Sequence, residues 1–207
     1  MSLRTGPDGR ARCWWCATAP DYVAYHDTEW GRPVRDERQL FEKLCLEGFQ
    51  AGLSWLTILR KRESFRRVFA GFDATVVARY RERDVDRLLA DASIVRNRAK
   101  IEATVHNART LLDVHARGET LSDLIWSHAP DPRPRPTTAS EVPAQTPDSR
   151  ELSTSLRARG FRFVGPTTAY ALMQACGVVD DHIAGCHVDP QETADGVGEA
   201  ADQQRRR

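Results

Sequence analysis

The stretch that decides the fold is RGFRFVGPTTAYALMQACG, residues 159–177. Gly160 is expected to end one helix, since glycine readily adopts the left-handed conformation found after a helix C-terminus. The next four residues, FRFV, are too few to form an element of their own. Pro166 follows Gly165 and suits the first position of a new helix, where its missing N–H costs nothing. The stretch therefore predicts two helices joined by a tight hairpin.

A hairpin of this kind directs backbone N–H groups and a helix N-terminus outward, which can hold a phosphate. Arginines at 157, 159 and 162 flank it and add positive charge. Helical corners that contain glycine are also common without any nucleic acid, so this segment alone leaves DNA binding open. The DNA-contacting residues that we predict are Arg162, Gly165, Thr167 and Thr168.

Helical patterns fill most of the remaining chain. Asp36 and Ser54 are suitable N-caps, and Gly118 is a suitable stop. The expected helices cover 36–48, 54–69, 73–80, 82–91, 99–118 and 150–160. We find no strand alternation and no internal repeat, so the predicted fold class is all-α.

Composition predicts two flexible tails and one long loop. Residues 1–11 and 189–207 have little to bury and are expected to be flexible tails, which leaves 12–188 as a single domain. The proline-rich run 128–149 is expected to be a long surface loop within that domain, because only about 60 residues follow it.

Charge and cysteine content limit the function classes. The net charge is +1, so any nucleic-acid contact must come from local basic patches. Five cysteines without an apolar N-terminal run indicate a cytoplasmic protein whose thiols are reduced or metal-bound. No segment approaches the roughly 18 consecutive apolar residues of a membrane span, so a membrane function is not expected.

Glu47 is a carboxylate on an apolar helix face. Leu40, Leu44, Glu47 and Ala51 are spaced by four, three and four residues, which places them on one side of a helix. A buried carboxylate must be paired, protonated or ready for a ligand, because burial of a lone charge is costly. Alternatively, Glu47 caps the helix that begins near Ser54. Trp55 follows at that helix start, and an acceptor beside a flat ring suits a flipped nucleobase.

Cysteines and histidines offer a possible zinc site. His182 and Cys186 are four residues apart, and Cys13 and His26 are separated by a loop. Together Cys13, His26, His182 and Cys186 make a Cys2His2 set, which suits a closed structural zinc site. Cys16 and His187 are competing ligands. The alternative that these are scattered buried cysteines and surface histidines also remains open.

Four segments of the chain carry a family resemblance: YVAYHDTEWG (22–31), LFEKLCLEGFQAGLSWLTILRKRE (40–63), RGFRFVGPTTAYALMQACG (159–177) and DHIAGC (181–186). They resemble the DNA-3-methyladenine glycosylase I family, part of the helix-hairpin-helix glycosylase superfamily. The resemblance implies a monomer of two helical lobes with a pocket between them. It also implies hydrolytic excision of 3-methyladenine from double-stranded alkylated DNA.

Site residues are carried over by position. The resemblance implies a base-binding carboxylate at Glu47, a stacking ring at Trp55 and a pocket tyrosine at Tyr25. Further aromatic lining would come from Tyr22, Trp15 and Trp30. The implied structural Zn²⁺ would tie the chain ends through Cys13, His26, His182 and Cys186, and the DNA-anchoring hairpin lies around Gly165.

The chemistry expected of such a site is selective capture. An adenine methylated at N3 is cationic and its glycosidic bond is already weakened, so an electron-rich pocket favours it. The three lysines, Lys43, Lys61 and Lys100, lie away from the hairpin, which favours simple hydrolysis over a Schiff-base lyase. We expect Asp180 to cap a helix or to orient His182, and its part in the reaction stays open.

Two other classes compete with a glycosylase. One is a non-catalytic helix-hairpin-helix module that binds damaged DNA. The other is an all-α zinc scaffold, which would have no use for a carboxylate at position 47.

Overall fold

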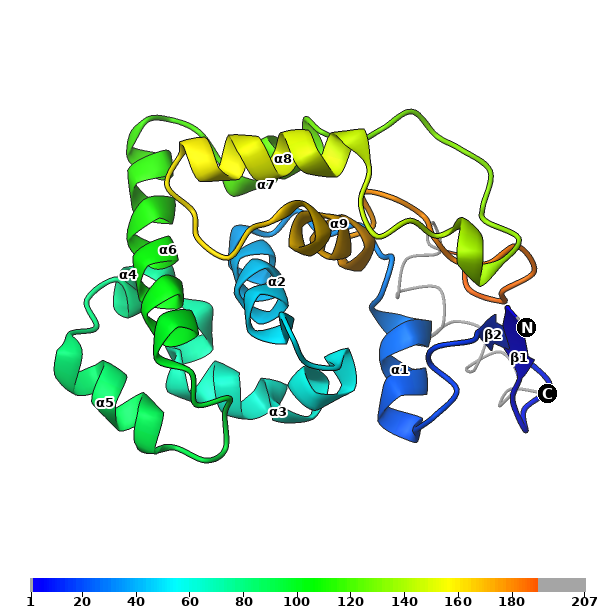
Figure 1. Ribbon diagram of the computed structural model, residues 1–207, viewed down its shortest axis with the longest axis horizontal. Helices are drawn as coiled ribbons and strands as arrows, with labels where there is room; N and C mark the ends of the chain where they lie inside the picture. Colours follow the sequence, from blue (N-terminus) through cyan, green and yellow to red (C-terminus); the bar gives the residue numbers. More distant parts are fainter. Residues whose placement is uncertain (1, 190–207) are drawn as a thin grey trace, which may run out of the picture. The chain divides into compact units, whose positions relative to one another are not determined.

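The computed structural model describes residues 2–189, and helices make up nearly all of their regular structure (Figure 1). The described chain falls into two units. Unit 1 comprises 2–33, 132–142 and 174–189, and unit 2 comprises 34–131 and 143–173. Within the described residues, no helix is long and apolar enough to cross a membrane. Of the predicted C-terminal tail 189–207, residues 190–207 lie outside the described part.

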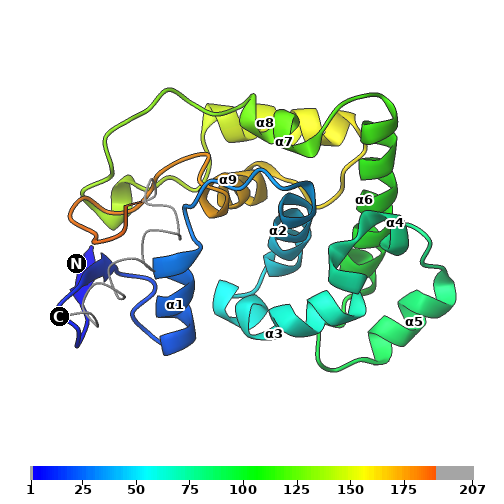
Figure 2. The same ribbon diagram turned by 180° about the vertical axis from the view of Figure 1, so that it is seen from behind.

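Unit 2 is built around α2 (Glu37–Gln50), which contacts α3, α6 and α7. From Leu40 to Phe49 every residue of α2 is buried. The other elements are α3 (Trp55–Val68), η1 (Ala70–Phe72), α4 (Ala74–Val77), α5 (Glu82–Ala90), α6 (Arg98–Ala116), α7 (Leu121–Trp126) and α8 (Pro147–Ala158). α9 (Pro166–Ala175) follows and runs into unit 1. α7 and α8 contact each other and lie side by side, also when seen from behind (Figure 2).

The helix ends confirm the predicted caps. The Asp36 carboxylate accepts from the Gln39 N–H at 2.9 Å, and the Ser54 hydroxyl accepts from the Thr57 N–H at 3.2 Å. Gly118 has φ +76° directly after α6, as expected for a helix stop. Thr120 caps α7, an element that the sequence analysis did not predict.

Phenylalanine rings fill the core of unit 2. Phe49 on α2 packs against Phe65 of α3 in a tilted arrangement with 4.5 Å between ring centroids, and Phe69 and Phe72 continue the cluster. Each fully buried ring contributes about 2–3 kcal/mol through removal of apolar surface from water. The predicted inward positions Leu40, Leu44 and Glu47 are buried as well.

The hairpin between α8 and α9 is present as predicted, but side chains of other helices hold its backbone. The N–H of Arg162 donates to Asn107 Oδ1 at 2.8 Å, and Asn107 Nδ2 donates to the Arg162 carbonyl at 3.0 Å. The Ser153 hydroxyl donates to the Val164 carbonyl at 2.6 Å. The expectation that the hairpin directs its own N–H groups outward is therefore wrong at Arg162. The helix N-terminus that the same expectation included is the start of α9, where Thr167 is exposed.

Unit 1 contains α1 (Pro20–Thr28), η2 (Ala139–Glu141) and a short antiparallel hairpin of β1 (Leu3–Thr5) and β2 (Ala11–Cys13). Leu3 pairs with Cys13 in this hairpin. The sequence analysis found no strand and expected a flexible tail over 1–11, so the hairpin corrects that expectation. Three-residue strands are too short to show alternation, which explains why the pattern gave no signal.

The C-terminal described segment packs on the hairpin. The His187 N–H donates to the Ala11 carbonyl at 2.8 Å, and the Ala184 N–H donates to the Pro136 carbonyl of the proline-rich loop at 2.8 Å. A small apolar cluster of Cys13, Ile183, Cys186 and Val188 forms there. The two ends of the described chain thus meet within unit 1, and the middle part of the long loop 128–149 belongs to the same unit.

Candidate functional site

Glu47 is the most perturbed carboxyl group of unit 2. It lies in the last turn of α2 with 5% of its surface exposed, and its Oε2 has no hydrogen-bond partner among the described residues. Burial raises its pKa to about 8, and the charge of Lys43 offsets only part of this effect. Glu47 is therefore mostly protonated at neutral pH in the substrate-free protein. Of the three states expected for a buried carboxylate, the raised pKa favours the protonated one until a ligand binds.

The alternative that Glu47 caps the next helix does not hold, because Ser54 makes that cap. Trp55 follows Ser54 as the first residue of α3 and is buried. Gly52, with φ +82°, makes the turn between the two helices. A short turn thus separates a protonated carboxyl from a large indole in unit 2, as the sequence predicted.

Two residues that the sequence analysis missed hold this segment. Lys100 of α6 donates from Nζ to the carbonyls of Phe49 and Ala51, at 2.8 and 2.5 Å. These carbonyls belong to the end of α2, where a cation satisfies unpaired acceptors and interacts favourably with the helix dipole. Phe163 of the hairpin packs on Gly48, where an added Cβ would lie 3.3 Å from the Phe163 Cβ. A buried lysine shortly after a helix start gives no sequence signal for this role.

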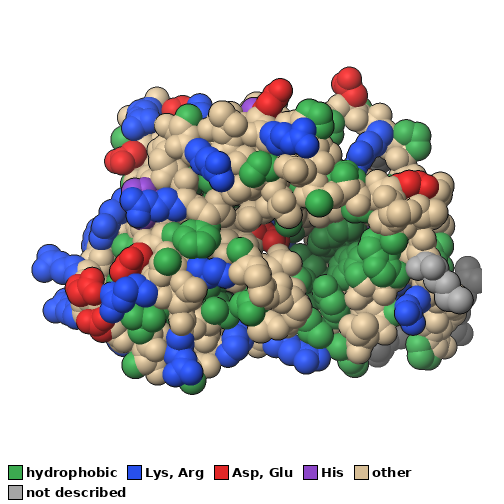
Figure 3. Space-filling view, viewed as in Figure 1, with side chains coloured by type: hydrophobic (Ala, Val, Ile, Leu, Met, Phe, Trp, Pro, Cys, Tyr) green, Lys and Arg blue, Asp and Glu red, His purple; other side chains and the backbone are tan. Residues whose placement is uncertain are grey.

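The predicted DNA-contacting residues lie at the surface of unit 2. Arg162 and Thr167 are exposed, and Gly165 and Thr168 are half-buried at the start of α9. Lys and Arg side chains are also spread over the side of unit 2 formed by α5 and α6, with acidic groups among them (Figure 3). This mixed surface agrees with the low net charge of the chain.

The four predicted aromatic residues of the N-terminal stretch gather in unit 1. Trp15 lies at the centre, with ring centroids 4.9 Å from Tyr22, 5.0 Å from Trp30 and 6.4 Å from Tyr25. Tyr25 is buried, and the other three are half-buried. The same rings touch the predicted metal ligands, since Trp30 lies 4.7 Å from the His182 ring.

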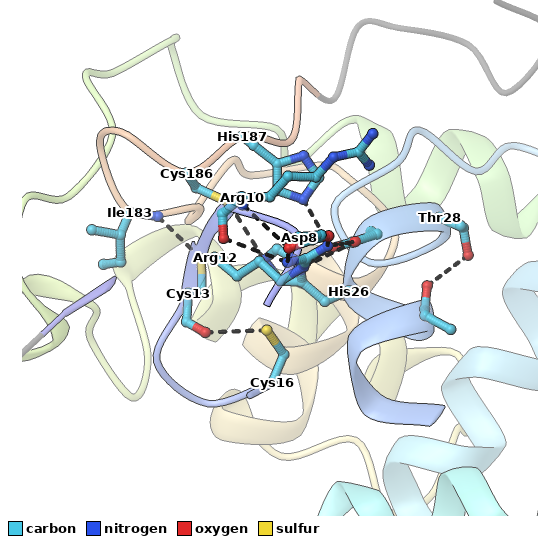
Figure 4. Close-up of polar contacts among 12 residues, drawn as sticks. Asp8, Arg10, Arg12, Cys13, Cys16, His26, Thr28, Ile183, Cys186 and His187 are labelled. Carbon is cyan, nitrogen blue, oxygen red and sulfur yellow. Dashed lines mark hydrogen bonds and ion pairs between the residues drawn. The ribbon is translucent and has the colours of Figure 1, made fainter. Parts of the chain in front are cut away.

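Three of the four predicted metal ligands meet in unit 1. The ligand atoms of Cys13, His26 and Cys186 lie within 4.8 Å of one another, and all three side chains are buried (Figure 4). His182 lies beside them, with its ring 5.2 Å from that of His26. Its Nε2 is buried and has no hydrogen-bond partner among the described residues. His182 does not belong to that group of ligand atoms, but its orphaned nitrogen and its ring beside that of His26 suit a fourth donor of a closed zinc site.

Each of the two histidines is oriented by an aspartate. His26 Nδ1 lies 2.7 Å from Asp27 Oδ1, and His182 Nδ1 lies 2.9 Å from Asp180 Oδ1. Such contacts fix the tautomer and leave each Nε2 as the metal donor. The predicted alternative in which Asp180 orients His182 agrees with this geometry, and Arg135 holds the other Asp180 oxygen at 2.6 Å.

Electrostatics inside the cluster favour one thiolate. Hydrogen bonds from the Cys13 thiol and His26 lower the pKa of Cys186. The hydrogen bond with Cys186, together with burial, raises the pKa of Cys13. Burial alone would lower the pKa of His26, but contacts with Cys16, Cys186 and Asp27 raise it to about 10. The Ile183 N–H also donates to Cys13 Sγ at 3.3 Å.

The competing ligands occupy different positions. The Cys16 thiol donates to the Cys13 carbonyl at 3.1 Å and also contacts His26. His187 belongs to a second possible group with His26 and Asp27, also within 4.8 Å. Gly31, at φ +77°, lies where a Cβ would come 2.5 Å from the His182 ring, so only glycine allows the imidazole this position.

The fold and these sites define a helix-hairpin-helix protein with a buried carboxyl group and a Cys/His cluster. The model of the methyladenine glycosylase family matches residues 15–189. The chain is 51% identical over 178 residues to DNA-3-methyladenine glycosylase 1 of Escherichia coli (strain K12), covering 84% of this chain and 95% of that protein. The chain therefore belongs to the methyladenine glycosylase family.

Solved structures agree. A crystal structure of 3-methyladenine DNA glycosylase I superposes with a TM-score of 0.83 at 48% identity, covering 85% of this chain and 98% of the other. A 3-methyladenine DNA glycosylase I from Staphylococcus aureus, studied for recognition of 3-methyladenine, has a TM-score of 0.80 at 35% identity. It covers 85% of this chain and 95% of the other.

Proposed function

We propose that this chain is a monofunctional DNA glycosylase that hydrolyses the N-glycosidic bond of 3-methyladenine in double-stranded alkylated DNA. The observation that carries the proposal is the buried Glu47, whose Oε2 has no partner among the described residues. A zinc scaffold has no use for this energetic cost, and a release assay separates a glycosylase from a non-catalytic DNA-binding module. Family membership and the relatives named above support the same substrate.

Glu47 discriminates by charge and by hydrogen bonding. In the substrate-free protein it holds a proton at neutral pH, because burial raises its pKa to about 8. A cationic methylated adenine favours the ionised carboxylate, so capture of the cation is coupled to loss of that proton. The carboxylate then accepts from the exocyclic amine of adenine, whereas guanine offers a carbonyl at that position. Neutral adenine gains less from the same group.

Trp55 supplies the stacking surface. Base–aromatic stacking contributes about 1–3 kcal/mol per base, and a cationic ring adds a cation–π attraction. Tyr25, Tyr22, Trp15 and Trp30 are proposed as further aromatic contacts of the base. Because the glycosidic bond of the cationic nucleoside is already weak, capture of the base supplies much of the catalysis.

The positions of the three lysines favour hydrolysis over lyase chemistry. Lys61 donates to the carbonyls of Ala92 and Ser93, and Lys100 donates to the end of α2. Lys43 is buried on α2. No lysine lies in the hairpin 160–165, so we propose that water is the nucleophile. Asp180 holds His182 and Arg135 rather than a substrate group.

DNA is proposed to bind through the hairpin and the first turn of α9. The helix N-terminus offers N–H groups and a positive dipole to a phosphate, and Arg162 adds a cation. The residues in this role are Arg162, Gly165, Thr167 and Thr168.

A structural Zn²⁺ is proposed at Cys13, His26, His182 and Cys186. Four protein ligands leave no open position for water, so the ion would contribute folding energy and no chemistry at the glycosidic bond. We further propose a cytoplasmic monomer. None of the five cysteines, all within the described residues, forms a disulfide, in agreement with a reducing compartment.

Incubation of the protein with alkylated duplex DNA, followed by chromatography of the released bases, tests the proposed reaction. We expect free 3-methyladenine well above its spontaneous rate of release. Binding of the alkylated duplex without release of base would instead identify a non-catalytic module.

A further inference from the structure

Two possible metal groups in unit 1 share His26. One group joins it to Cys13 and Cys186, and the other joins it to Asp27 and His187. The groups use opposite nitrogens of the ring. Nε2 lies 3.5 Å from Cys186 Sγ, and Nδ1 lies 2.7 Å from Asp27 Oδ1. The partner that holds the Asp27 carboxylate therefore decides which ring nitrogen of His26 remains for a metal ion.

The partner of the Asp27 carboxylate is the guanidinium of Arg12. Its Nε lies 3.0 Å from both carboxylate oxygens and its Nη2 lies 2.7 Å from Oδ2. Asp8 binds the same guanidinium from the other side at 2.8 and 2.6 Å (Figure 4). Arg12 is only 5% exposed, and Asp27 is largely buried. This is a fixed cation held between two carboxylates rather than a loose surface pair.

The position of Arg12 has two consequences. The guanidinium holds the Asp27 carboxylate where Oδ1 meets Nδ1 of His26, which leaves Nε2 as the ring nitrogen that faces Cys186. The same positive charge lies on the oxygen that a metal ion would need in the group with His187. Like charges in a poorly solvated position repel, so that second group is disfavoured.

We propose that Arg12 and Asp27 are positioning residues of the zinc centre, which direct His26 Nε2 to the thiols and exclude metal from the group with His187. The inference rests on the proposed zinc site. Arg12 and Asp8 belong to the N-terminal hairpin, which precedes residue 15, where the family match begins. The hairpin thus supplies the proposed ligand Cys13 as well as the outer partners Arg12 and Asp8.

Three variants test the proposal: Asp27→Asn, Arg12→Met and Asp8→Asn. Zinc affinity of the full chain is measured by competition with a chromogenic chelator. Loss of an outer partner of a metal-bound histidine typically weakens metal binding about 10- to 100-fold. We expect this loss for Asp27→Asn and Arg12→Met, and a smaller loss in the same direction for Asp8→Asn, which leaves the contact of Asp27 with His26 in place.

Arg98→Met is the matched control. Arg98 is also held by carboxylates, those of Glu82 and Asp86 at 2.5 and 2.6 Å and that of Glu102 at 3.3 Å, but it lies in unit 2. We expect its zinc affinity to equal that of the wild-type protein. Circular dichroism with excess zinc shows that each variant is folded, and Asp8→Asn carries the test if the other two variants do not fold.

Cobalt substitution separates positioning from general destabilisation. Thiolate ligands give Co²⁺ a charge-transfer absorption that ligation by two histidines and a carboxylate lacks. We expect Arg12→Met to lose part of this band, because the group with His187 becomes available, and Asp27→Asn to keep the band with weaker binding. Wild-type affinity and an unchanged spectrum in all folded variants would overturn the proposal. If Cys13→Ser also keeps its zinc, the proposed zinc site itself is wrong.

Discussion

Replacement of Glu47 by glutamine should stabilise the protein and impair its function. Burial raises the pKa of Glu47 from the ordinary 4.5 to about 8, so the folded state binds this proton more tightly than the unfolded state. Its contribution to stability is then fully present below pH 4.5 and is lost as the pH rises toward 8. Within that window the free energy of unfolding falls by about 1.36 kcal/mol for each pH unit, so the loss reaches about 3 kcal/mol at pH 7.

Glutamine has a similar shape and does not ionise. The difference in free energy of unfolding between Glu47→Gln and wild type should therefore grow by about 3 kcal/mol between pH 4.5 and pH 7. Urea unfolding of both proteins at several pH values measures this difference. Titration of other groups, including the proposed metal ligands, is common to both proteins and cancels.

Glu63→Gln is the control for this prediction. Glu63 is an exposed carboxylate on α3, paired with Arg66. Its variant should differ from wild type by only a small amount, because exposed ion pairs contribute little to stability. A constant difference for Glu47→Gln over the same range would refute the reasoning, because it would mean that Glu47 ionises in the folded protein as it does in water.

Three further predictions concern the surroundings of this site. Trp55→Ala should reduce release of 3-methyladenine about 5- to 150-fold through the loss of one stacking contact, and Trp55→Phe should retain part of it; equal rates in steady-state release assays would contradict the role. Asn107→Ala removes two hydrogen bonds to the Arg162 backbone and should lower the affinity for duplex DNA without loss of bound zinc, measured by fluorescence anisotropy and metal analysis. Lys100→Met leaves two carbonyls at the end of α2 without their donor and should lower stability by about 1.5–3 kcal/mol in urea unfolding, with partial rescue by Lys100→Arg.

The helical part of the fold could be predicted from the sequence because its signals are local. Asp36 and Ser54 cap the helices that follow them, and Pro166 begins α9 as its fixed φ suggests. The N-terminal hairpin could not be predicted, because its strands are three residues long. Thr120 with Asp123 three residues later offered a cap signal for α7, but the six-residue helix has too few turns to show periodicity.

The candidate site divides in the same way. The burial of Glu47 followed from helical spacing, and the gathering of Cys13, His26 and Cys186 followed from the residue types and the family resemblance. The role of Lys100 depends on contacts with residues that are remote in sequence. The role of Asp27 depends on a contact geometry that only the folded chain fixes. Lys100, for example, reaches carbonyls that lie 49 and 51 positions earlier.

The central claim is that Glu47 captures the alkylated base and so drives its release. Single-turnover release of 3-methyladenine from alkylated duplex DNA, compared between wild type and Glu47→Gln, tests it most directly. A hydrogen bond to a charged group contributes about 1.5–3 kcal/mol, so we predict release slower by about 10- to 150-fold in the variant. Release by Glu47→Gln at the wild-type rate would contradict the account.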